Sequence, residues 1–138
     1  MTYSPNEVVA KITEQVFKEK AELFKSDNED SNSSVFVNEN RLCLEAFLNK
    51  YGQLFFESLN EHSSDITYGL LLGLTKRFME FSFKHVLDLC KADRQDHAEK
   101  VLTMLTANVT PKIAASVDEG AGVYVMYREL KKIIDGMF

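Results

Sequence analysis

Apolar residues recur at three- and four-residue spacing along most of the chain, the spacing of one face of an α-helix. The first such segment follows Ser4-Pro5, which is a helix-start signal, and extends to about Lys25. A second begins near Asn38 and ends near Ser64. Residues 26–34 between them read SDNEDSNSS and contain no apolar residue. We therefore expect a mobile acidic loop there.

A third helix is predicted over about residues 65–91, with Ser64 or Asp65 as its cap. Its apolar residues occupy several faces rather than one stripe, which is typical of the central helix of a bundle. Gly69 and Gly73 are four residues apart and therefore share a face. We expect this small-residue pair to let a neighbouring helix approach closely.

Asp93 is the predicted cap of a fourth helix, and Pro111 is expected to stop that helix because proline lacks the backbone N–H. A short segment follows, with Gly120 and Gly122 as its break. A last helix is predicted through about residues 123–136.

The predicted fold class is all-α, as a single compact bundle or orthogonal array of five to six helices around the third. Residues 1–138 form one domain by length, and the apolar content is ample for a core. The short connections favour antiparallel neighbours.

Charge and composition exclude several classes of protein. The net charge of −5 argues against non-specific binding to nucleic acid or to an anionic membrane. The longest apolar cluster is too short for a bilayer span, so we expect no membrane insertion. The first residues resemble no signal peptide. Cys43 and Cys90 are compatible with a single disulfide. The favoured interpretation is two reduced thiols in a cytoplasmic protein.

No motif for phosphate binding, zinc binding or nucleophilic catalysis occurs. The acidic loop lacks the glycine and glutamate that a calcium-binding EF-hand loop requires. Ser26 and Ser31 lie beside acidic residues, where a kinase that prefers acidic sites could act, but an inert loop is the simpler expectation. We therefore expect no catalytic residue, no metal and no cofactor.

His85 carries the main alternative. It lies on the apolar third helix, with about fifty residues after it, and a haem protein of globin type needs a histidine so placed beside an apolar pocket. The alternative function is therefore a domain that binds haem or a small apolar ligand in a cavity between the third and last helices. A core or boundary histidine is the commoner case.

Aromatic residues give the leading functional hypothesis. Phe55 and Phe56 are consecutive, and Phe81 and Phe83 also diverge, so a single stripe cannot hold all four. We expect Phe56 or Phe83 to lie on a surface that binds a protein partner or a second copy. The alternative is that a further helix of the same chain covers both. The predicted function is a non-enzymatic protein–protein interaction module, of an adaptor, regulatory or self-associating kind.

Overall fold

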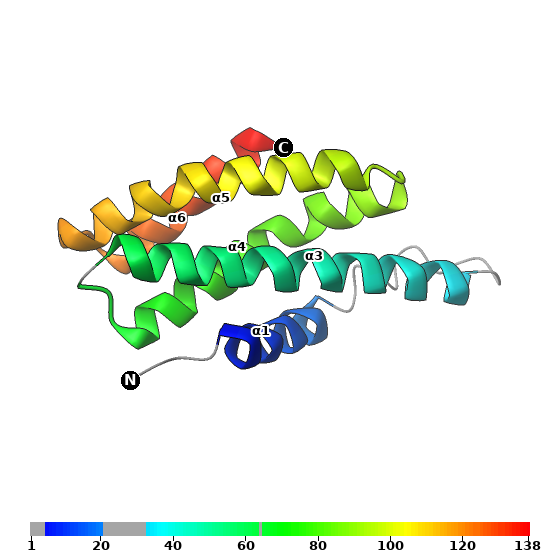
Figure 1. Ribbon diagram of the computed structural model, residues 1–138, viewed down its shortest axis with the longest axis horizontal. Helices are drawn as coiled ribbons and strands as arrows, with labels where there is room; N and C mark the ends of the chain where they lie inside the picture. The colour runs from blue at the N-terminus through cyan, green and yellow to red at the C-terminus, as the bar shows by residue number, and fades with distance from the viewer. Residues whose placement is uncertain (1–4, 21–32, 64) are drawn as a thin grey trace.

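The computed structural model describes residues 5–20, 33–63 and 65–138, with side chains described from residues 6–20, 40–63 and 65–138. It is all-helical, as the sequence predicts, and those ranges contain no strand (Figure 1). The described part of the chain forms five helices: α1 (Pro5–Glu19), α3 (Ser33–His62), α4 (Tyr68–Lys91), α5 (Gln95–Asp118) and α6 (Val123–Met137).

The first two helices differ from their predicted bounds. α1 ends at Glu19, and residues 21–32 lie outside the described part of the chain. α3 begins at Ser33, earlier than the predicted start at Asn38. The last two residues of the loop expected at 26–34 are therefore helical, while the rest of that loop, with both of its serines, falls outside the described residues.

α4 is the central helix, as its apolar pattern predicts, because it packs against α1, α3, α5 and α6. Leu71, Leu74 and Phe78 on α4 are all buried. Phe78 stacks on Phe55 of α3, with ring centroids 4.5 Å apart. The core is therefore centred on the seam between α3 and α4.

Helices that are adjacent in sequence run antiparallel, but the bundle also has parallel neighbours, which the sequence did not predict. Tyr51 is hydrogen-bonded to Thr103 at 3.0 Å, and Ser58 to Thr110 at 3.0 Å, so α3 and α5 run in the same direction. Because α6 returns antiparallel along α5, it is parallel to its other neighbour, α4. α4 and α5 lie diagonally across the bundle, so they contact each other less extensively than either of them contacts α3 or α6.

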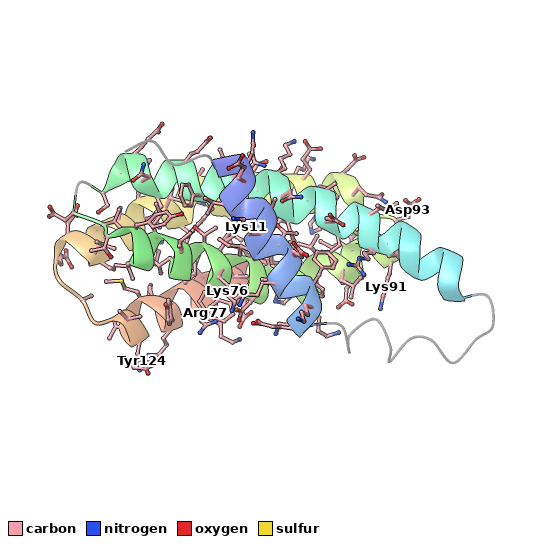
Figure 2. All side chains as sticks on the ribbon, turned by 90° about the horizontal axis from the view of Figure 1, so that it is seen from below. Lys11, Lys76, Arg77, Lys91, Asp93 and Tyr124 are labelled. Atoms are coloured by element: carbon pink, nitrogen blue, oxygen red, sulfur yellow. The ribbon has the colours of Figure 1, made fainter. Side chains whose placement is uncertain are left out.

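α1 lies obliquely across α3 and α4 on one face of the bundle (Figure 2). Gly52 of α3 is buried where the three helices meet. A Cβ atom at Gly52 would lie 3.0 Å from Val9 of α1 and 3.1 Å from Met79 of α4. The glycine costs helix propensity, and the close three-helix contact explains its presence.

The predicted close approach at the Gly69–Gly73 pair is confirmed for Gly73 alone. A Cβ atom at Gly73 would lie 2.7 Å from the Tyr127 hydroxyl of α6. Nothing lies within 4 Å of the corresponding position at Gly69, which is exposed. Only one of the two glycines therefore meets a neighbouring helix.

The caps differ from those predicted. Thr67 caps α4, since its side chain accepts a hydrogen bond from the Leu70 N–H, so Asp65 does not have this role, and Ser64 lies outside the described residues. Asp93 does not cap α5 but closes α4, in the left-handed region with φ 56°. The backbone N–H groups of Asp93 and of the next residue bond back into α4, as in a Schellman motif. Aspartate is among the residues that tolerate this conformation.

α5 does not stop at Pro111, which contradicts the sequence-based expectation. The helix continues to Asp118. Pro111 is exposed, so the Ala107 carbonyl that loses its helical donor is on the solvent side. Ile113 and Ala114 beyond the proline are buried, and their burial stabilises the continued helix.

Candidate interaction surface

Phe56 and Phe83, the residues expected on a partner surface, are both in the core. The exposed fraction is 1% for Phe56 and 0% for Phe83. Phe83 meets Phe17 of α1 edge-on, with ring centroids 5.2 Å apart. The expectation of a surface position is corrected: other helices of the same chain cover both rings.

The number of neighbours explains why consecutive aromatic residues are both buried. α3 packs against α1, α4 and α5, so its buried arc is wider than one stripe. Phe55 contacts α4 by stacking on Phe78. Phe56 points about 100° further round α3, but it is still on the buried side of the helix. A helix with one packing face could not bury both rings, but α3 packs against three helices.

His85 lies at the edge of the α4–α6 contact and is partly exposed. Its Nε2 is 3.1 Å from a carboxylate oxygen of Asp135 on α6. Its ring stacks on Phe138, with centroids 4.8 Å apart. Hydrogen bonds from Lys131 and His85 hold the pKa of the Asp135 carboxyl below its usual value. The histidine is thus part of a surface ion-pair cluster.

The surface between α4 and α6 beside His85 is lined mostly by charged residues, together with Phe81. A depression of about 420 Å³ there is bordered by His85 and by Glu80, Lys84 and Lys131. A haem or apolar-ligand pocket would need mainly apolar walls. The surroundings of His85 therefore do not favour the alternative function.

One surface feature is the uncharged outer side of α5. Residues 101–111 of this helix include no charged residue over three turns. Met104 is 56% exposed at the middle of the run, and Thr103, Ala107 and Pro111 are exposed with it. Solvent-facing helix surfaces normally carry charged residues. An uncharged exposed side is typical of a surface that contacts another protein.

Leu54 of α3 extends this surface across the seam between the two helices. It comes three residues after Tyr51 and four before Ser58, which both hydrogen-bond to α5, so it lies at the α3–α5 seam. Its exposed fraction is 41%. We call the set Leu54, Thr103, Met104, Ala107 and Pro111 the α5 face.

A shallow, open depression of about 470 Å³ follows α5 from the α5 face toward the helix N-terminus. It is lined by Asp96, Glu99, Lys100, Thr103 and Met104. Lys50 of α3 pairs with Glu99 at its border, with 3.2 Å between the charged atoms. Charged residues thus border the α5 face on this side.

A second exposed apolar group lies at the start of α6. Val123, Tyr124 and Val125 are consecutive and exposed, and Tyr124 reaches 85% (Figure 2). They belong to the first turn of one helix, and Tyr127 in the following turn is partly buried under Arg77. This group lies on one helix only, whereas the α5 face includes residues of two helices.

The uncharged run that forms the α5 face can be seen in the sequence. The run Val101–Pro111 has a lysine immediately before it and another immediately after it. Its lack of charge is visible without a structure, and the tertiary structure shows which side of the run is exposed. Val101, Leu102, Leu105, Thr106, Val109 and Thr110 are buried, so only the outer side of the run contributes to the surface.

Metal and membrane signatures are absent from the part of the chain that the structure describes. No three His, Cys, Asp or Glu side chains there come together as metal ligands would. No helix within the same residues combines the length and the apolar character needed to cross a bilayer. Comparisons with protein-family models, curated proteins and solved structures give no significant match.

Proposed function

We propose that the protein is a non-enzymatic protein–protein interaction module that self-associates through the α5 face. The supporting observation is the exposed, uncharged side of α5 over residues 101–111, with Met104 at its middle. Apolar surface of this kind gains free energy when another protein removes it from water.

A second copy of the chain is the occupant that the chemistry favours. The chain carries a net charge of −5, so two copies repel each other over most of their surfaces. The α5 face contains no charged residue, so a contact between two copies at this face places no like charges directly against each other. In a two-fold symmetric contact the same patch meets itself, so Met104 of each copy packs against the α5 face of the other.

The test is the molar mass of the protein in solution, measured by light scattering over a concentration series from about 1 to 500 µM, a range suited to a weak interface. We expect the mass to rise from 15.7 kDa toward twice that value. Met104→Glu places a charge at the middle of the α5 face and should keep the mass at that of one chain. Its melting temperature should stay near that of wild type, because Met104 is exposed.

Tyr124→Glu is the matched control, because it places the same charge at a more exposed apolar residue outside the α5 face. This variant should still double in mass. A wild-type protein that remains a single chain at every concentration would overturn self-association. So would loss of association in Tyr124→Glu with none in Met104→Glu.

A further inference from the structure

The two cysteines of the chain face each other across the central seam of the bundle. Cys43 lies on α3 and Cys90 near the end of α4, and both are free thiols. Their sulfur atoms are 2.8 Å apart, which is closer than ordinary van der Waals contact between two sulfurs. A disulfide bond is about 2.05 Å long, so the sulfurs need to approach by only about 0.8 Å to form one.

Helix packing fixes this approach. Phe55 stacks on Phe78 along the same antiparallel pair of helices. Cys43 precedes Phe55 by twelve residues, and Cys90 follows Phe78 by twelve residues. The same register of α3 against α4 therefore sets both contacts, and the cysteines meet without a change in the packing of the core.

We propose that Cys43 and Cys90 form a redox-responsive pair that closes to an intramolecular disulfide when the protein meets a disulfide oxidant such as glutathione disulfide. The inference does not depend on the proposed self-association.

The two cysteines differ in solvent accessibility, and this difference determines which thiol reacts first. Cys43 is partly exposed, whereas Cys90 is buried. In the reduced pair, burial and the contact with Cys43 raise the pKa of the Cys90 thiol, so Cys90 forms the attacking thiolate less readily than an ordinary thiol, and its burial keeps external reagents away from it. Cys43 is therefore the thiol that reacts first, and Cys90 resolves the resulting mixed disulfide.

The reaction balances as two thiol–disulfide exchanges. Cys43 loses its proton and its sulfur attacks glutathione disulfide, whose S–S bond breaks. One glutathione leaves and takes up that proton, and a mixed disulfide remains on Cys43. Cys90 then loses its proton and attacks the Cys43 sulfur, and the second glutathione leaves with the proton. Two electrons pass from the cysteine pair to the oxidant, which is released as two molecules of reduced glutathione.

The closed bond would join α3 to α4 beside the α4–α5 turn. It would enclose a long loop, because the two residues are 47 positions apart. Cross-links that close long loops restrict the unfolded chain most strongly. We therefore expect the oxidised protein to melt about 10 °C above the reduced protein.

The experiment incubates the folded chain with glutathione disulfide and follows intact mass, thiol count and melting temperature. Wild type should lose two hydrogen atoms in mass and both free thiols, and should return to the starting mass with dithiothreitol. Cys90→Ser should instead retain one glutathione on Cys43, since no resolving thiol remains. Cys43→Ser should stay unmodified, because Cys90 is buried.

Two results would overturn the proposal. One is a wild-type protein that keeps two free thiols in glutathione disulfide. The other is a wild-type protein that accumulates the glutathione adduct without closing the internal bond. Both measurements use wild type, so they remain decisive even if a serine variant fails to fold. Repeating them on Met104→Glu separates the result from self-association, because that variant should still form the disulfide.

Discussion

Individual aromatic residues contribute strongly to the stability of this core. Phe78 is fully buried, and its ring stacks on Phe55 across the α3–α4 seam. Such a ring contributes both buried apolar area and a favourable ring–ring contact. Because α4 packs against every other described helix, a cavity at Phe78 would weaken the packing of the whole bundle.

Phe78→Ala should lower the free energy of unfolding by about 3–5 kcal/mol, since it removes the stacked ring and leaves a cavity that the packed helices cannot fill. Urea unfolding followed by circular dichroism would measure the loss. Leu42→Ala on α3 is the control, and because Leu42 is largely exposed it should change stability by less than about 0.5 kcal/mol. A Phe78→Ala variant as stable as wild type would show that the α3–α4 seam is not the centre of the core.

At the scale of the element, α5 shows how tertiary contacts can override a local stop signal. Pro111 removes one helical hydrogen bond in the interior of a 24-residue helix. Buried residues on both sides of it, Val109 and Ile113, keep the inner side of the helix continuous. Thr110 beside it donates its hydroxyl hydrogen bond to the Thr106 carbonyl, at 2.9 Å. The proline therefore costs stability without breaking the helix.

Pro111→Ala should raise the free energy of unfolding by about 1–3 kcal/mol, because alanine restores the missing hydrogen bond and has a higher helix propensity. Urea unfolding at low protein concentration would measure the gain apart from any association. Lys112→Ala, at the next exposed position, should leave stability within about 0.5 kcal/mol of wild type. A destabilised Pro111→Ala variant would mean that the bundle needs a break in α5 at this position.

For the whole molecule, the position of α1 depends on one glycine. α1 lies obliquely over α3 and α4 (Figure 2), and it approaches closely at Gly52. Val9 of α1 and Met79 of α4 occupy the space where a side chain at residue 52 would lie. A larger residue there has to displace the Val9 or Met79 side chain.

Gly52→Leu should lower the free energy of unfolding by about 1–3 kcal/mol through overpacking and should loosen α1 before the rest of the bundle. Hydrogen exchange followed by mass spectrometry would show faster exchange in α1 than in α5. Gly69→Leu is the matched control, because nothing lies within 4 Å of a Cβ atom at that glycine. Equal exchange in α1 for the two variants would contradict the close contact at Gly52.

The sequence alone determined the fold class, the central helix and most of the core. These features follow from apolar spacing, which is a local property of each segment. Leu71, Leu74 and Phe78 of the helix predicted to be central are buried, and the glycines after α5 do form the break before α6, where Gly120 has φ 76°. Helix ends were less well predicted, because caps such as Thr67 depend on the path of the connecting chain.

Tertiary structure alone decided which helices are neighbours and therefore which residues are exposed. Phe56 and Phe83 are buried because α3 and α4 each have several partners, and no periodic pattern specifies that number. Packing of α5 in the bundle buries one side of its uncharged run and leaves the other side exposed. Packing also brought Cys43 and Cys90 together from 47 residues apart. Spacing along one helix carries no information about the register between two helices, and only packing of the whole core fixes it.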